Sequence, residues 1–303
     1  MTRRKSSQDR AMHFIDAKSI LTPRSMNIYR GCSHGCIYCD ARSSCYQFRH
    51  AFEDIEVKRN AAELLDEALR KKRRRCMIGT GSMGDPYIPA EKNLCLMRRC
   101  LEIIDRHDFG VTVQTKSDLV LRDLDILGRI NRKAKAVVQM TLTTADDGLC
   151  RIIEPGVCPT SRRFEVLCAC RGRGIPTVVW LSPLLPFIND TPGNIDGIMD
   201  YCIRAGVKAV ICFGMGLTLR EGNREYFYAA LGRAAANDKR FLGLKDRYVR
   251  TYGNSYIVSS PDERALMSRL ARACREHGIM LGTDSVFRWM EEFPEDPLQA
   301  QLF

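Results

Sequence analysis

Residues 27–45 read NIYRGCSHGCIYCDARSSC, and this stretch decides which fold and chemistry the chain can have. Cys32, Cys36 and Cys39 are separated by three and then two residues, and Tyr38 directly precedes the last of them. Soft thiolates at this spacing bind an iron–sulfur cluster or zinc. A [4Fe–4S] cluster has four irons, so three protein thiolates would leave one iron free for a ligand from outside the protein.

Two other interpretations of the cysteines stay open at this point. Cys45 could act as a fourth thiolate and close a tetrahedral structural zinc site with the first three cysteines. Disulfides are disfavoured, because 14 cysteines in a chain without an apolar signal core indicate a reducing, cytoplasmic environment. Most cysteines outside the stretch fall in apolar or helical runs, where a free cysteine behaves as a small hydrophobic residue.

The composition favours an anionic partner, such as DNA, without identifying it. The chain has 303 residues, a formal net charge of +11 and 45% hydrophobic residues, and no apolar run is long enough to cross a bilayer. Six consecutive basic residues occupy positions 70–75, and they could contact phosphates or form the solvated end of a helix. Residues 1–19 are predicted to form a flexible basic arm.

Short aliphatic runs alternate with amphipathic segments between residues 20 and 215. The predicted strands cover residues 26–29, 76–80, 110–115, 137–142, 176–181 and 207–213. Between them, apolar residues recur at helical spacing, as at Leu94, Met97, Leu101 and Ile104. Apolar strands that alternate with helices predict an α/β protein with a parallel sheet buried on both faces. Six such units predict a partial (β/α)6 barrel of the TIM type, with its chemistry at the carboxyl ends of the strands.

The chain beyond residue 215 follows a different pattern. Residues 216–290 are predicted to form an α-rich extension packed on the barrel, in which Tyr248, Tyr252 and Tyr256 could line a substrate entrance or pack in a core. Residues 291–303 form an acidic tail that ends in the peptide Gln299 to Phe303. This ending resembles the peptide that docks on bacterial sliding clamps, with Leu-Phe in an apolar pocket. The alternative is a terminal segment that docks its own Leu-Phe pair on the barrel.

The pattern Cx3CxφC, in which φ is aromatic, resembles the signature of the radical S-adenosylmethionine (SAM) enzymes. Within them the chain resembles the spore photoproduct lyase and DNA-repair-photolyase-like family, over stretches that lie between about residues 20 and 215. The stretches are YRGCSHGCIYCDAR, IGTGSMGDPYIPAEK, VTVQTKSDLVLRD, LTTADDGLCRIIEPGVCPTSRRFEVL and GIPTVVWLSPLLPFIND. The resemblance implies a [4Fe–4S] cluster on Cys32, Cys36 and Cys39, with SAM on the open iron. An electron from a donor such as flavodoxin or ferredoxin would then cleave SAM and yield a 5′-deoxyadenosyl radical.

The resemblance also implies cofactor contacts at several strand ends. The candidate cofactor-binding residues are Tyr38, Gly81, Ser82, Lys116, Thr141, Thr143 and Arg162. Lys116 matches a lysine that pairs with the cofactor carboxylate, and Thr141 and Thr143 could bond the ribose or the carboxylate. Arg162 or Arg163 could reach the same carboxylate through a charge-assisted pair. Each has an ordinary alternative, because lysine and threonine are common at strand ends and paired arginines at helix starts.

Ser82 marks a departure from the lyase pattern. In the spore lyase a cysteine at the matching position donates a hydrogen atom late in the reaction, and a serine O–H bond is too strong to do so. The resemblance therefore implies the radical initiator without the hydrogen-return step. Three functions follow: a radical enzyme that repairs or modifies a nucleic-acid base, one that modifies a small molecule or peptide, and a non-catalytic iron–sulfur or zinc protein that binds nucleic acid. The sequence favours the first.

Overall fold

The fold is organised around one large, mainly parallel sheet. The structure is a computed structural model and describes residues 12–294. The strand order in the sheet is β13-β10-β9-β8-β7-β6-β3-β2, and every neighbouring pair is parallel except β2 with β3. The strands are β2 (Leu21–Thr22), β3 (Ser25–Met26), β6 (Met77–Thr80), β7 (Gly110–Thr115), β8 (Ala136–Thr141), β9 (Thr177–Trp180), β10 (Ala209–Ile211) and β13 (Met280–Leu281). The edge strands β2 and β13 do not pair with each other, so the sheet is open.

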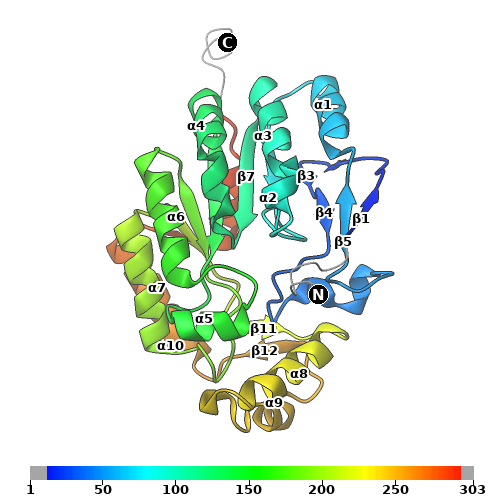
Figure 1. Cartoon of the computed structure of the whole chain (residues 1–303). Helices are drawn as coiled ribbons and strands as arrows, with labels where there is room; N and C mark the ends of the chain where they lie inside the picture. The colour runs from blue at the N-terminus through cyan, green and yellow to red at the C-terminus, as the bar shows by residue number, and fades with distance from the viewer. Residues whose placement is uncertain (1–11, 295–303) are drawn as a thin grey trace, which may run out of the picture.

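Helices cover both faces of this sheet, which explains why its strands are apolar throughout. All six residues of β8 are buried. The helices are α1 (Ala61–Lys71), α2 (Glu91–Leu94), α3 (Leu96–Arg106), α4 (Leu124–Lys133), α5 (Asp147–Ile153), α6 (Thr160–Gly172), α7 (Pro192–Ala205), α10 (Glu263–Glu276) and α11 (Thr283–Glu291). Figure 1 shows α1, α3, α4, α6 and α7 arranged around one side of the sheet, with the red C-terminal helix behind it. On that second side, Val286 and Met290 of α11 pack against Val137, Val178 and Ile211 of the strands.

The predicted strands at residues 76–80, 110–115, 137–142, 176–181 and 207–213 are confirmed as β6 to β10, with small shifts at their ends. The first predicted strand, at residues 26–29, is wrong in part because the chain divides there between two sheets. β3 belongs to the large sheet, whereas β4 (Tyr29–Arg30) pairs with β5 (Ile55–Lys58) in a three-stranded sheet of order β1-β5-β4. β1 (Met12–Ile15) lies in the predicted flexible arm, and its backbone is held by parallel pairing with β5.

Part of the predicted C-terminal extension returns to the large sheet. α10 packs beside α7, and β13 pairs in parallel with β10, so this segment adds a further strand at the sheet edge. The remainder forms a separate layer, seen at the bottom of Figure 1. That layer holds β11 (Gly216–Thr218), α8 (Asn223–Ala235), the 3-10 turn η4 (Lys239–Phe241), α9 (Leu244–Tyr252) and β12 (Ile257–Ser259). β11 and β12 pair antiparallel, and residues 299–303, the predicted clamp peptide, lie outside the described range.

Short 3-10 turns lie in the loops that follow β4 and β7. The turns are η1 (Asp40–Arg42), η2 (Ser44–Tyr46) and η3 (Asp118–Asp123). Between residues 12 and 294, no helix combines the length and the apolar character that a bilayer span requires.

A buried carboxylate, Glu91, joins three parts of the fold. It is fully buried and accepts hydrogen bonds from the Leu96 and Met97 amides at 3.0 and 3.1 Å, which are the first two residues of α3. An anion is favoured at this position by the orphan amides and the dipole of the helix. The Tyr29 hydroxyl of β4 also donates to Glu91, and the Arg122 guanidinium of η3 donates at 2.7 Å. Glu91 therefore fixes β4, α3 and η3 relative to one another.

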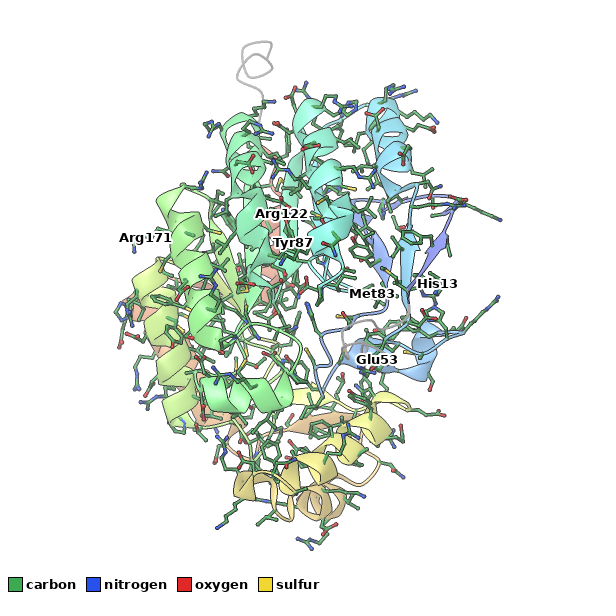
Figure 2. All side chains as sticks on the ribbon, viewed as in Figure 1. His13, Glu53, Met83, Tyr87, Arg122 and Arg171 are labelled. Atoms are coloured by element: carbon green, nitrogen blue, oxygen red, sulfur yellow. The ribbon has the colours of Figure 1, made fainter. Side chains whose placement is uncertain are left out.

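The Tyr87 side chain lies in the interior of the protein, beside the residues that contact Glu91. Its side chain is fully buried, and its hydroxyl donates to the Asp123 carboxylate at 3.0 Å. Tyr87 and Arg122 lie near each other in the middle of the molecule in Figure 2, with the guanidinium 6.0 Å from the ring centre. The turn after β6 is thereby anchored to η3.

Glu91→Ala is expected to lower the free energy of unfolding by about 3–5 kcal/mol, because it removes one member of a buried ion pair and leaves several buried donors unpaired. Glu102→Ala is the matched control, since Glu102 is half exposed and pairs with Arg98 at 3.5 Å on the surface. The Glu102→Ala substitution should lower the free energy of unfolding by about 1 kcal/mol or less. Urea unfolding of both variants under oxygen-free conditions measures the difference. Equal, small losses would contradict the structural role given to Glu91.

Candidate functional site

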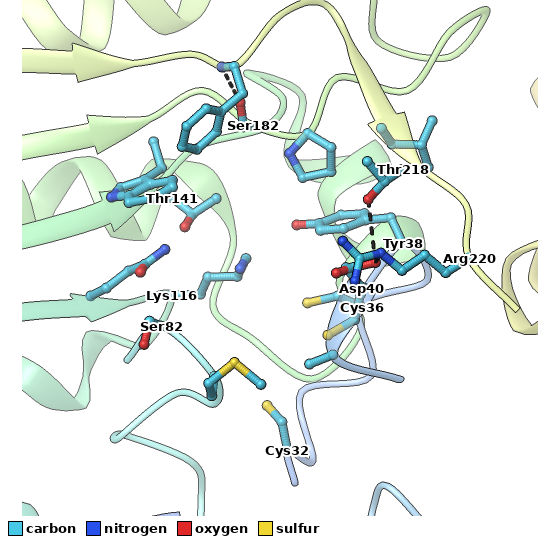
Figure 3. Close-up of a pocket in the computed structure, with 18 of the residues that line it drawn as sticks. Cys32, Cys36, Tyr38, Asp40, Ser82, Lys116, Thr141, Ser182, Thr218 and Arg220 are labelled. Carbon is cyan, nitrogen blue, oxygen red and sulfur yellow. Dashed lines mark hydrogen bonds and ion pairs between the residues drawn. The ribbon is translucent and has the colours of Figure 1, made fainter. Parts of the chain in front are cut away.

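A cavity of about 700 Å³ lies at the carboxyl ends of the parallel strands. Its walls come from the cysteine loop, the segments that follow β6, β7, β8 and β9, and the β11–β12 pair. Figure 3 shows Lys116 and Thr141 projecting from the strand ends into the space that Cys36 and Tyr38 face from the opposite side. All three motif cysteines line this cavity. Parallel α/β sheets place ligands at this edge, so the cavity is the candidate active site.

Backbone hydrogen bonds hold the cysteine loop on both sides. The Cys32 amide donates to the Phe52 carbonyl at 3.1 Å, and the Ile37 amide donates to the Ile153 carbonyl at 3.0 Å. Gly31 precedes the first cysteine at φ +92°, and a Cβ there would lie 2.6 Å from the Phe52 carbonyl oxygen. Only glycine permits this approach without a shift of the backbone. The loop is therefore positioned by residues 52 and 153, which are far from it in sequence.

The three thiols differ in their electrostatic surroundings. Burial raises the pKa of the Cys36 and Cys39 thiols above the ordinary value for cysteine. Burial acts in the same direction on Cys32, but the adjacent His34 lowers the pKa of that thiol overall. Thiolates buried at such a site need a bound cation, and a metal cluster would supply the positive charge.

The spacing of the thiols suits a cluster better than one zinc ion. A tetrahedral zinc–thiolate site places its sulfur atoms about 3.8 Å apart, given Zn–S bonds of about 2.3 Å. Among the described residues, Cys32, Cys36 and Cys39 are not a group whose ligand atoms all lie within 4.8 Å of one another. Cys45 is exposed, does not line the cavity, and its sulfur contacts the Arg220 guanidinium at 3.2 Å. Three thiols on one cavity, with Cys45 outside it, are the donor set of a [4Fe–4S] cluster with one open iron, and the residues present fit that group.

A buried charge network lies directly behind the cysteine loop. Arg163 and Glu154 are both fully buried and form an ion pair at 2.6 Å, and the Tyr38 hydroxyl donates to the same carboxylate. Burial alone would raise the pKa of Glu154, but Arg163 and Lys116 hold it below its ordinary value. Burial alone would lower the pKa of Lys116, but Cys36 and Glu154 raise it overall. Lys116 is thus held as a cation, with its Nζ 5.9 Å from the centre of the Tyr38 ring.

Asp85 joins the ends of β6 and β7 to the cysteine loop. Its carboxylate accepts from the Thr115 hydroxyl and the Lys116 amide, both at 2.7 Å, and from the Tyr87 amide at 2.8 Å. The His34 imidazole lies 3.4 Å from the same carboxylate. Asp85 therefore fixes the backbone from which the Lys116 side chain enters the cavity. This role could not be predicted from the residue type, since an aspartate in a turn is common.

The structure brings together most of the residues predicted for the site. Tyr38, Gly81, Ser82, Lys116 and Thr141 all line the cavity with the three cysteines. The cavity is also lined by residues that sequence reasoning missed, among them Asp40, Trp180, Ser182, Phe213, Thr218, Arg220 and Glu263. Asp40, Trp180 and Ser182 lie in stretches that carry the family resemblance, but no ligand contact was predicted for them there. Phe213, Thr218 and Arg220 lie outside these stretches, on or near β11.

Two predicted cofactor residues do not reach the cavity. The Arg162 guanidinium is occupied on the outer surface by Asp118 at 2.9 Å and by Glu165. Its neighbour Arg163 points inward instead, because only that position of α6 faces Glu154. Thr143 is fully buried, and its hydroxyl has no partner within the described part of the chain.

Only one of the three tyrosines predicted for the entrance takes that position. Tyr256 lines the cavity, and its hydroxyl contacts the Arg220 guanidinium at 2.6 Å. Tyr248 is fully buried and donates to the Pro186 carbonyl, and Tyr252 donates to the Ser259 carbonyl. Those two residues pack in the C-terminal layer.

The fold and the site together define a protein with three cysteines around a cavity at the carboxyl edge of a parallel sheet, a donor set that suits an iron–sulfur cluster. Residues 26–193, more than half of the chain, match the family model of the Radical SAM superfamily. The uncharacterized protein Rv2578c of Mycobacterium tuberculosis is 30% identical over 258 residues, which cover 82% of this chain and 72% of that protein. The chain belongs to the Radical SAM superfamily, whose members use a [4Fe–4S] cluster and SAM.

Two further similarities are to an archaeal protein, over a shorter stretch, and to a solved structure. The uncharacterized protein MJ0683 of Methanocaldococcus jannaschii is 31% identical over 185 residues, covering 58% of this chain and 68% of that protein. The structure of spore photoproduct lyase complexed with dinucleoside spore photoproduct superposes with a TM-score of 0.58. It is 14% identical and covers 89% of this chain and 81% of that one. At this identity the likeness is one of fold.

Gly81→Ala is expected to destabilise the protein by about 2–4 kcal/mol and to displace Ser82, since Gly81 has φ +98° and a Cβ there would lie 2.1 Å from the Gln114 carbonyl oxygen. Gly172→Ala at the end of α6 is the matched control, because its Cβ would meet nothing within 4 Å. Alanine there should be neutral or stabilise by about 0.5–1 kcal/mol. Thermal and urea unfolding compare the two variants. Equal effects would contradict the close approach described for Gly81.

Proposed function

We propose that this protein is a radical SAM enzyme that abstracts a hydrogen atom from a nucleic-acid base, in DNA repair or modification. The observation that carries the proposal is that an aromatic pair, Trp180 and Phe213, lines the same cavity as the three motif cysteines. The cluster and SAM together supply, when bound, a carbon radical able to abstract a hydrogen atom. Every other part of the proposal concerns what the residues of this chain do around that chemistry.

The residues near the cysteines would bind and orient SAM. Cys32, Cys36 and Cys39 would hold the cluster and leave one of its four irons for SAM. Lys116 is a cation directed into the same space, so it suits the SAM carboxylate through a charge-assisted hydrogen bond. Thr141, at the neighbouring strand end, offers a hydroxyl to the ribose or the carboxylate. The β11–β12 layer closes the cavity from the other side and would limit the access of water to the radical.

The far wall of the cavity has the chemistry that a nucleobase needs. The Trp180 and Phe213 rings lie 5.5 Å apart between their centres, and Phe213 is 62% exposed. Bases stack on aromatic side chains without strict sequence preference. Arg220 lines the same cavity on the side of β11, where it lies 3.4 Å from Asp40. The Arg220 guanidinium lies over the Tyr256 ring, 5.1 Å from its centre, and a guanidinium on an aromatic ring suits a phosphate or a stacked base.

Two further features favour nucleic acid over a small molecule. The formal net charge of +11 attracts a polyanion. The similar structure, spore photoproduct lyase, carries a dinucleoside photoproduct by its own description. The predicted clamp peptide at residues 299–303 would deliver the enzyme to DNA, and it stays a prediction.

The reaction would not end with a hydrogen atom returned to the substrate by a thiol at position 82. Ser82 lines the cavity at the position where the sequence resemblance implies a cysteine, and a serine O–H bond is too strong for hydrogen-atom donation. Among the described residues that line the cavity, the three motif cysteines are the only thiols. The proposal therefore covers radical generation and hydrogen abstraction, and assigns no hydrogen-return residue.

The proposal predicts DNA binding that depends steeply on salt and on the cavity aromatics. Fluorescence anisotropy of a labelled oligonucleotide, with cluster-loaded protein and no oxygen, should show affinity falling between about 50 and 200 mM salt. Phe213→Ala should weaken binding by about 1–3 kcal/mol, because one stacking surface is lost. Phe14→Ala is the control, since Phe14 is also about half exposed but stands on β1 outside the cavity.

Affinity that is negligible and insensitive to salt would refute the nucleic-acid assignment. Formation of 5′-deoxyadenosine in that case would leave a radical enzyme for a small molecule or peptide. Equal losses in the Phe213 and Phe14 variants would show that the cavity is not where DNA binds.

A further inference from the structure

Two histidines and a carboxylate meet on the small sheet, apart from the cavity. His13, His50 and Glu56 each offer one ligand atom, and these atoms all lie within 4.8 Å of one another. None of the three lines the cavity. We propose that they form a second metal site, for a divalent transition metal and in particular Zn²⁺. Figure 2 shows His13 on the small sheet, at the right of the molecule.

The pairing of strands places two of the ligands side by side. β1 and β5 are parallel neighbours, and His13 stands directly opposite Glu56 in their register. Side chains at paired positions project from the same face of a sheet, with Cβ atoms about 5 Å apart. His50 comes from the loop before β5 and reaches Glu56 through its Nε2, which lies 3.0 Å from the carboxylate. The ligands therefore come from a strand pair and from a loop that the same pair holds in place.

Hydrogen bonds fix both imidazoles in the orientation that a metal ligand needs. The Nδ1 of His50 lies 3.0 Å from the Ala51 carbonyl, and the Nδ1 of His13 lies 3.0 Å from the Asp54 carboxylate. A carbonyl and a carboxylate can only accept, so each Nδ1 carries the proton and each Nε2 is left as the ligand atom. Metal-binding histidines characteristically donate their second ring nitrogen in this way. At His50 a second proton lies between Nε2 and the Glu56 carboxylate in the metal-free protein, and a metal ion would displace it.

The charge around the three side chains permits a cation. Arg30 of β4 and Lys58 of β5 are the nearby positive groups, and the Arg30 Nη1 lies 3.8 Å from Glu56. Its Nη2 donates to the Tyr46 and Gln47 carbonyls at 3.0 and 3.3 Å, and its guanidinium lies over the Phe48 ring. Arg30 is thus also held by other partners, so an ion at Glu56 would compete with a long 3.8 Å contact and with the hydrogen bond to His50. The Glu56 side chain is 13% exposed, that of His50 is 18% and that of His13 is 41%, so the site is partly open and water can reach it.

The donor set and its geometry favour zinc. Two imidazoles and one carboxylate are a common zinc combination, in which water takes the fourth position. Ligand atoms of a tetrahedral zinc site lie about 3.4 Å apart, so the side chains would close by about an ångström around the ion. Such a site would bind β1 to the loop at residues 48–54. That loop includes Phe52, whose carbonyl accepts from the Cys32 amide, so the metal would brace the cysteine loop from behind.

The test is zinc binding by cluster-loaded protein that carries no polyhistidine tag. After equilibrium dialysis against Zn²⁺, metal analysis should find one zinc ion per chain in addition to the iron. X-ray absorption at the zinc edge should show nitrogen and oxygen ligands at about 2.0–2.2 Å and no sulfur at about 2.3 Å. His13→Ala and Glu56→Gln should each abolish the bound zinc. Asp54→Asn should weaken binding by about 10- to 100-fold, because it loosens the His13 imidazole without removing a ligand.

His107→Ala is the matched control, because His107 also pairs with a carboxylate, Asp66, at 2.7 Å but has no second histidine beside it. It should retain the zinc. Circular dichroism and melting of the zinc-free variants show that each one folds. The proposal is overturned if the wild type retains no zinc, if zinc persists in the His13 and Glu56 variants, or if sulfur ligands appear at the zinc edge.

Discussion

The buried pair of Glu154 and Arg163 is the constraint on which the site depends. Two fully buried ions at 2.6 Å are tolerated only when further hydrogen bonds satisfy them, and two of the bonds here end on parts of the site. Glu154 accepts from the Tyr38 hydroxyl in the cysteine motif, and Arg163 donates to the Thr141 carbonyl at the end of β8 at 3.0 Å. The negative charge of Glu154 also raises the pKa of Lys116 and so helps to keep it protonated. One ion pair thus connects the cysteine loop, a strand end and the cation that faces the cavity.

The small sheet and the C-terminal layer support the loop from two other directions. The Phe52 carbonyl accepts from Cys32, and its loop leads into β5, the central strand of the small sheet. On the opposite side, Cys36 and Tyr38 pack in a second hydrophobic core with Leu217 and Phe227 of the C-terminal layer. The cysteine loop therefore lies between two structural units that the large sheet alone does not provide. A metal ion on the small sheet would stabilise one of them.

The large sheet could be predicted from the sequence because its strands are apolar throughout, and this pattern depends only on local residues. The cysteines, Lys116 and Thr141 could be placed because a strand end fixes where its side chains point. Arg162 was misplaced because a helix start offers two adjacent arginines, and which one faces inward depends on the partner that is buried there. Trp180 and Phe213 were missed because they meet only when β9 and β10 pair, and β1 because its stability comes from pairing with β5.

The central claim is that the three motif cysteines carry a cluster with one iron open to SAM. The most direct measurement is 5′-deoxyadenosine formed by anaerobically reconstituted protein after addition of dithionite and SAM, compared between Cys36→Ala and Cys45→Ala. Cys45 is the matched control, because it lies in the same stretch but outside the cavity. The account predicts product in the wild type and in Cys45→Ala, and none in Cys36→Ala. Zinc in place of iron, with no product from any of the three proteins, would contradict it.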